Sequence, residues 1–174
     1  LVSQESHTPL HRFDIIGFSL LYELNFTNIL TMLDLAGIPF FASSRTGSSF
    51  PLIIAGGPCT CNPEPVSDFF DAMVVGDGEK VILKMAQVWD RSKEKFEILK
   101  AWSRIEGVYI PSFFEAGTVQ SHDGFALQTL SPASPDYIKV RRAIVNNLDT
   151  APFPKSPIIP YGKPVHDRLR LEIS

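Results

Sequence analysis

The sequence predicts an α/β fold in which a Rossmann-like, mostly parallel sheet is flanked by helices. Two short apolar runs, 51–55 and 71–75, are each followed by a glycine-rich turn. Helical segments separate the apolar runs, and crossover connections of this length force neighbouring strands to run parallel. In such sheets ligands bind beyond the carboxyl ends of the strands. The two glycine turns are therefore where we expect function.

The first expected strand is the nearly continuous apolar run 13–21, which is typical of a strand covered on both faces. A helix capped by Asn25 or Thr27 should follow and stop at Gly37. Its apolar positions share one helical face: Ile29, Leu30, Leu33 and Ala36.

Further helices are expected at about 63–70, 78–92 and 94–105. The first of these begins with two prolines, which suit a first helical turn because their missing N–H has no partner there. The second has an apolar stripe typical of a buried face: Val81, Ile82, Met85, Val88 and Trp89. The third carries Phe96, Leu99 and Trp102, and Gly107 should end it.

The pattern changes after Gly107. A strand is expected at 108–115, a hairpin turn at His122-Asp123-Gly124 and a returning strand at 125–130. The stretch 148–164 contains five prolines, which favour an extended tether. We therefore expect two parts: an α/β domain at 1–107, and a small β extension with a proline-rich linker at 108–174.

Composition narrows the function classes. The chain has 174 residues, 44% of them hydrophobic, and a net charge of −3, so it lacks the clustered basic face that nucleic-acid binding requires. No apolar run approaches a membrane span, and residues 1–5 do not resemble a signal peptide. A cytoplasmic location is therefore expected. The start at Leu1 and the end at Ser174 suggest a fragment of a longer chain.

Residues that could bind a metal or act as nucleophiles are few. Cys59 and Cys61 form a CxC pair without further cysteines, a poor zinc or cluster site, so free thiols are expected. The four histidines are dispersed in polar contexts: His7, His11, His122 and His166. No catalytic triad or carboxylate pair can be assembled.

Each glycine turn permits two interpretations. Gly56-Gly57-Pro58 either lets the chain leave a strand tightly or allows a ligand to approach the backbone. In Gly76-Asp77-Gly78-Glu79 the two carboxylates can bind a ligand or serve the next helix, with Asp77 as its cap and Glu79 in its first turn, and the two roles are compatible. Tyr22-Glu23-Leu24-Asn25 is expected at the same edge, as part of a pocket or as a helix cap. Neither glycine turn matches a dinucleotide-binding or P-loop motif.

Four segments together resemble the N-terminal cobalamin-binding-like domain of radical S-adenosylmethionine Fe–S oxidoreductases. They are Asp14–Ser19, Ile54–Pro58, Asn62–Pro65 and Val75–Glu79, and the stretches Tyr22–Asn28 and Leu33–Pro39 resemble one branch of this group. In those proteins a strand like Leu169–Ser174 leads into a CxxxCxxC loop, which this sequence does not reach.

The resemblance implies a Rossmann-like domain that serves a C-terminal radical S-adenosylmethionine domain, its expected partner. The 4Fe–4S cluster and S-adenosylmethionine would be bound by that domain, so this fragment alone should be inactive. Cobalamin is the implied cofactor, although the Asp-x-His-x-x-Gly loop of cobalamin binders is missing here. The positions matching those that surround the ligand are Gly56, Gly57, Pro58, Gly76, Asp77, Gly78 and Glu79. The alternative is a degenerate domain with a structural role, whose strand-end crevice would be plugged by Phe or Tyr side chains.

Overall fold

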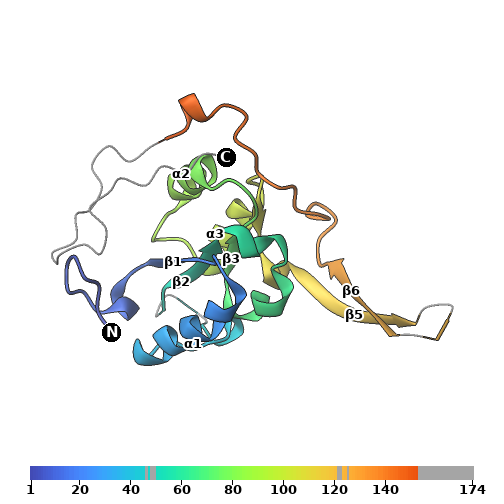
Figure 1. Cartoon of the computed structure of the whole chain (residues 1–174), viewed down its shortest axis with the longest axis horizontal. Helices are drawn as coiled ribbons and strands as arrows, with labels where there is room; N and C mark the ends of the chain where they lie inside the picture. The colour runs from blue at the N-terminus through green and yellow to red at the C-terminus, as the bar shows by residue number, and fades with distance from the viewer. Residues whose placement is uncertain (46, 48–49, 121–122, 125, 153–174) are drawn as a thin grey trace.

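A four-stranded sheet forms the centre of the molecule (Figure 1). The structure is a computed structural model that describes residues 1–45, 47, 50–120, 123–124 and 126–152. The strand expected at 169–174 and most of the proline-rich tether lie outside the described residues.

The strands of this sheet follow one another in chain order: β1 (Ile15–Ser19), β2 (Leu52–Gly56), β3 (Ala72–Val74) and β4 (Val108–Tyr109). The first three are parallel, and β4 joins β3 antiparallel. Because the three parallel strands point the same way, the glycine turns after β2 and β3 share one edge of the sheet, as predicted. The α/β class is confirmed.

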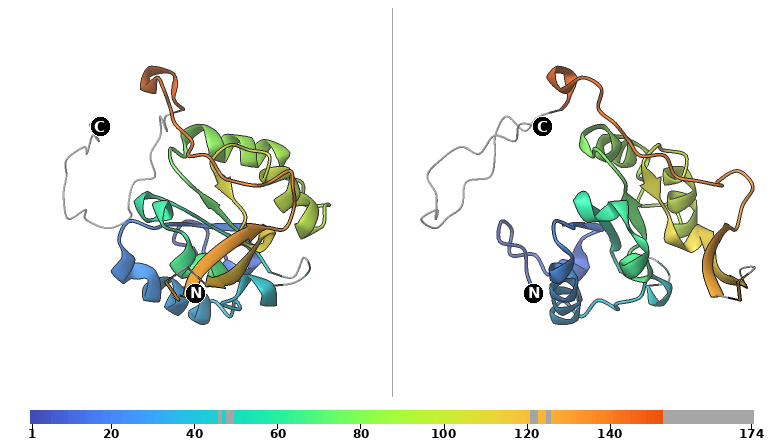
Figure 2. Two further views of the ribbon diagram at one scale, coloured as in Figure 1. Left: turned by 90° about the vertical axis from the view of Figure 1, so that its right-hand side faces the viewer. Right: turned by 45° about the vertical axis from the view of Figure 1, so that its right-hand side comes forward.

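Helices cover both faces of this sheet (Figure 2). Helix α1 (Phe26–Leu35) packs Ile29 and Leu33 into a core cluster with Ile53 and Met73. On the other face, helices α2 (Glu79–Val88) and α3 (Lys95–Trp102) pack against the alternate strand residues. The strands contribute Leu52, Ile54 and Val74 to this core, and the helices contribute Val81, Met85 and Trp102. Successive strand residues point to opposite faces, so one apolar run supplies both cores.

The amino end of the sheet is closed by a buried cluster of charges. Asp71, just before β3, is 2% exposed and accepts the Ile53 N–H at 2.7 Å. The Arg45 guanidinium lies 3.1 Å from the same carboxylate and also donates to the carbonyls of Pro39, Phe40 and Phe69. Lys95, at the start of α3, pairs with the second oxygen of Asp71. Three segments distant in sequence are thus held together at this end.

Some predicted elements differ from those observed. Within the helix expected at 63–70, residues Glu64–Phe69 form a 3-10 helix, a form that is common in short connecting segments. The strand expected at 108–115 is interrupted by a 3-10 turn at Pro111–Phe113, since proline has no N–H to donate to a ladder. Its first part is β4, the edge strand of the central sheet.

A hairpin is present as predicted, but its first strand begins where the strand expected at 108–115 ends. It consists of β5 (Phe114–Gln120) and β6 (Ala126–Pro132), which pair antiparallel as a separate sheet and project from the body (Figure 1). Asp123 and Gly124 lie at its tip, whereas His122 and Phe125 lie outside the described residues. The division of the chain near Gly107 stays a prediction.

Among the described residues, no helix has the length and apolar character needed to cross a bilayer.

Candidate functional site

A groove of about 530 Å³ lies at the carboxyl ends of β1, β2 and β3. Strand residues on one face of the sheet line it, including Gly17, Ser19 and Val74. Glu79 and Ile82 from the first turns of α2 also line it. A groove at this edge is the usual ligand position in open parallel sheets. Its size falls within the range of small-molecule sites.

Five of the predicted site residues line this groove: Gly56, Gly57, Gly76, Gly78 and Glu79. Pro58 and Asp77 do not. The structure therefore brings the two glycine turns together. It also shows that individual residues within each turn have different roles.

Gly57 is required by the chain's own packing. Its φ of +100° belongs to a region that other residues rarely adopt, and an added Cβ would lie 3.0 Å from the carbonyl oxygen of Leu20. Leu20 follows β1, donates to the Gly56 carbonyl at 2.7 Å and accepts from the Cys59 N–H at 3.0 Å. Backbone hydrogen bonds at this turn therefore join the end of β1 to the end of β2.

Gly76 is also explained by a neighbouring segment. Residues 137–145, here called the strap, return along the body after the hairpin, and Ala143 forms a parallel bridge with Gly76. Gly76 has φ +100°, and an added Cβ would overlap the Ala143 carbonyl oxygen. Gly107, at φ +86°, approaches the same Ala143. The two glycines form a slot for this part of the strap.

Asp77 holds the strap rather than capping a helix. Its Oδ2 accepts the Val145 N–H at 2.7 Å, and Arg142 lies 3.9 Å from its other oxygen. The residue before α2 is Gly78, and no side chain caps this helix. The predicted cap role of Asp77 is therefore wrong. Its partner lies 68 positions away in sequence, so no local pattern could have identified it.

The chain's own packing does not account for the remaining glycines of the groove. Gly78 has φ −84°, and none of the described atoms lies within 4 Å of an added Cβ. At Gly17 and Gly56 an added Cβ would make only ordinary contacts, of 3.6 Å with Ile54 and 4.0 Å with Val74. Side chains at these positions would occupy the groove without straining the backbone.

The residues between the two turns are largely structural. Pro58–Cys61 forms a 3-10 turn in which Thr60 donates to the carbonyls of Gly57 and Val74, each at 2.8 Å. Cys59 is buried and Cys61 exposed, and both are free thiols, as predicted. Burial raises the pKa of the Cys59 thiol, and the nearby Glu23 carboxylate raises it further. A thiol held neutral in this way is a poor nucleophile.

The Tyr22–Asn25 stretch does not line the groove. Glu23–Asn25 forms a 3-10 turn that continues directly into α1, without a side-chain cap bond from Asn25. Glu64, from the Asn62–Pro65 segment of the family resemblance, accepts a hydrogen bond from the Tyr109 hydroxyl of β4. Burial is the main reason that the pKa of Tyr109 lies far above its usual range. This bond ties the 3-10 helix to the sheet.

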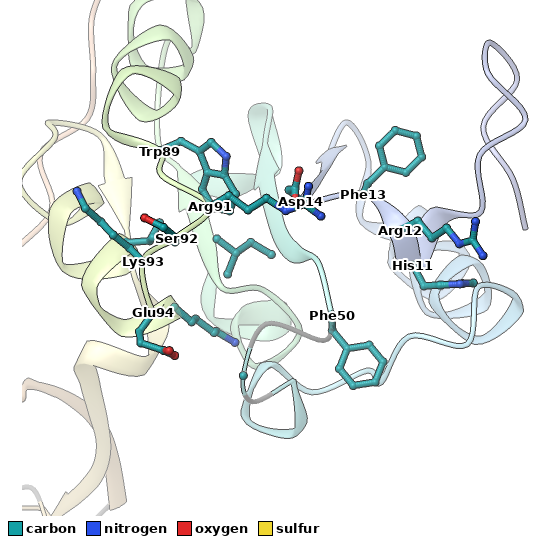
Figure 3. Close-up of a pocket in the computed structure, with 14 residues that line it drawn as sticks. His11, Arg12, Phe13, Asp14, Phe50, Trp89, Arg91, Ser92, Lys93 and Glu94 are labelled. Atoms are coloured by element: carbon teal, nitrogen blue, oxygen red, sulfur yellow. The ribbon is translucent and has the colours of Figure 1, made fainter.

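A second cleft, of about 630 Å³, lies at the opposite, amino end of the sheet (Figure 3). It contains the exposed ion pair of Asp14 with Arg91, at 3.1 Å. Lys93 and His11 lie at opposite ends of this cleft and do not converge (Figure 3). Its residues come from three distant segments, which is why the sequence did not indicate it. Among the described residues, no group of three His, Cys, Asp or Glu side chains could hold a metal ion.

Residues 1–111 match the family described as "Radical SAM proteins, N-terminal". The chain belongs to this family. Searches among curated proteins and among solved structures gave no match. In this radical SAM N-terminal domain the matched residues include the whole central sheet and both glycine turns. The hairpin and the strap follow the matched region.

Proposed function

We propose that this domain binds or positions a cofactor or substrate in the strand-end groove for radical chemistry carried out by another domain of its parent protein. The observation that supports this most is the open groove, lined by glycines that the fold itself does not require. Gly17, Gly56 and Gly78 bring backbone, rather than side chains, to the groove surface. A ligand can therefore approach closely. The partner domain would carry the 4Fe–4S cluster and S-adenosylmethionine, since two cysteines cannot supply a three-cysteine motif.

Cobalamin is the cofactor that the family resemblance suggests, and the groove fits it only in part. None of the described histidines lines the groove, and His11 lies at the opposite end of the sheet. A cobalt-ligating histidine is therefore not among the described groove residues. A groove of about 530 Å³ is suited to a small substrate or to one portion of a larger cofactor.

The alternative, a domain with only a structural role, is favoured by a different observation. Gly57, Gly76 and Asp77 each have a contact within the chain that explains them. Against this alternative, the described groove is not plugged, and Phe18 is its only aromatic lining residue in the described part of the chain.

Titration with hydroxocobalamin, followed by visible spectroscopy and gel filtration, tests the cofactor part of the proposal. Gly17→Leu should fill the groove with a side chain, while Ala116→Leu adds similar bulk on the hairpin, away from the groove. The proposal predicts a spectral change and retained corrinoid that Gly17→Leu abolishes and Ala116→Leu preserves. If neither the wild type nor the control retains corrinoid, cobalamin is excluded as the ligand. Equal retention by all three proteins would place binding outside the groove.

A further inference from the structure

The strap is held to the body by few contacts. Tyr137 anchors its beginning, with a hydroxyl that donates to the Val108 carbonyl at 2.6 Å and accepts from the Ile110 N–H at 3.0 Å. From 138 to 152 Ala143 is the only buried residue, whereas Val140, Val145 and Ala151 are partly buried. One buried methyl group and a few partly buried side chains hold the segment less firmly than a fully buried core element would be held.

Polar contacts supply the rest of the attachment. The Ala143 N–H donates to the Val75 carbonyl at 2.9 Å, and the Ala143 carbonyl accepts from the Asp77 N–H at 3.0 Å. The third contact is the bond from the Val145 N–H to the Asp77 carboxylate. Asp77 thus contributes both its backbone and its side chain. Its side chain is 33% exposed, so water can compete for this last bond.

The geometry of the slot explains why these residues are suited to docking the strap. Gly76 and Gly107 leave room for Ala143 only because neither has a Cβ. Asp77 directly follows Gly76, and its carboxylate binds the next part of the strap through the Val145 N–H. The strap therefore enters a slot that is shaped for it and is held at its far side by one carboxylate.

We propose that the strap is a releasable latch that Asp77 holds closed. This latch couples the rim of the groove to the chain that continues beyond residue 145. Gly76 and Gly78 flank Asp77, and both line the groove. A ligand that displaces the 76–78 turn opens the latch, and one that packs on the turn as it stands keeps the latch closed. By linkage, the docked strap then alters ligand affinity by the same factor. The coupling to a ligand rests on the proposed function, whereas the latch itself does not.

Amide hydrogen exchange of Ala143 and Val145 tests the latch in the whole chain. Asp77→Ala should accelerate exchange at both amides about tenfold or more, because a bond to a charged acceptor is lost. Asp77→Asn keeps an acceptor oxygen and should retain part of the protection. Asp90→Ala is the matched control: Asp90 also accepts a backbone N–H, from Ser92 at 2.9 Å, but it lies away from the strap. This control should leave both strap amides unchanged.

Unchanged exchange at Val145 in Asp77→Ala would overturn the latch, as would equal acceleration at Ile53 in the sheet core. If Asp77→Ala does not fold, Ala143→Leu gives the second test, because the larger side chain cannot enter the slot between Gly76 and Gly107. It should release Val145 while Asp77 remains intact. Continued protection of Val145 in this variant would contradict the account.

Addition of hydroxocobalamin separates the latch from the proposed function. Binding that changes Val145 exchange supports the coupling, and binding that leaves it unchanged contradicts the coupling while the groove assignment stands. Absence of binding counts against cobalamin in the groove, and the outcome for the Asp77 and Ala143 variants still decides the latch.

Discussion

The two ends of strand β3 each carry an aspartate that accepts a backbone N–H at 2.7 Å, yet their surroundings differ. Asp71, at the amino end, is buried and paired with Arg45 and Lys95. Asp77, at the carboxyl end, is partly exposed and accepts from Val145 of the strap. The amino end is thus fixed by buried charges, whereas the carboxyl end combines an open groove with a lightly held segment. Function is generally found where local stability is lowest.

Loss of the charge at Asp71 should have the largest effect on stability. Asp71→Asn leaves the buried Arg45 guanidinium without its counter-charge, and breaking a buried pair in this way costs about 3–5 kcal/mol. Urea unfolding measures this loss. Asp14→Asn is the control, since its pair with Arg91 has the same 3.1 Å separation but is exposed. The control should cost less than about 1 kcal/mol. Similar losses in both variants would remove the distinction between a structural and a solvated ion pair.

At the carboxyl end, the two kinds of glycine should respond differently to alanine. Gly57→Ala forces a side chain into φ +100° and against Leu20, which should cost about 1–3 kcal/mol in the free energy of unfolding. Gly78→Ala has an ordinary helical φ and open space, so its cost should be within about 0.5 kcal/mol. Thermal or urea unfolding of both variants checks this. A large cost at Gly78 would show that the fold needs this glycine and would weaken the groove proposal.

The beginning of the strap should make stability sensitive to alkaline pH. Burial raises the pKa of Tyr137 from 10.0 to about 12. Because the folded state holds this proton more tightly, the contribution is complete below pH 10 and is lost as the pH rises towards 12. Each such tyrosine should lower the free energy of unfolding by about 1.4 kcal/mol per pH unit in that range.

Urea unfolding between pH 9 and about 11.5 measures this slope. In Tyr137→Phe, the free energy of unfolding should fall less steeply with pH, because one phenol proton no longer contributes to the slope. The exposed Tyr22→Phe should match the wild type. An unchanged slope in Tyr137→Phe would mean that the strap begins without a buried phenol.

The sequence allowed the three parallel strands of the central sheet to be predicted because their signal is local, whereas β4 was expected in the β extension. The apolar runs at 13–21 and 71–75 contain β1 and β3, the run at 51–55 covers all of β2 but Gly56, and the glycine turns after β2 and β3 meet at one edge as expected. Two limits are also local in origin. The helix expected at 63–70 is a 3-10 helix over Glu64–Phe69, and Pro111 begins a 3-10 turn that interrupts an expected strand.

The contacts that give each site residue its own role join residues far apart in the sequence. Asp77 meets Val145, Gly76 and Gly107 meet Ala143, and Arg45 reaches Asp71 across 26 positions. Hydrophobic periodicity carries no information on such pairs, so of the two roles considered for Asp77 the helix cap was wrong, and the charge cluster was not predicted. A charged residue at the start of a buried strand, as at Asp71, was the available signal, because a buried carboxylate requires partners.

Hydrogen exchange at Ile53 and Val145 compares the two ends of β3 most directly, because each N–H donates to an aspartate oxygen over 2.7 Å. We expect Ile53 to exchange only through global unfolding, and Val145 to exchange at least about a hundredfold faster through local opening of the strap. Equal protection of the two amides would show that the strap belongs to the rigid core, and would contradict a fixed amino end and an adjustable carboxyl end.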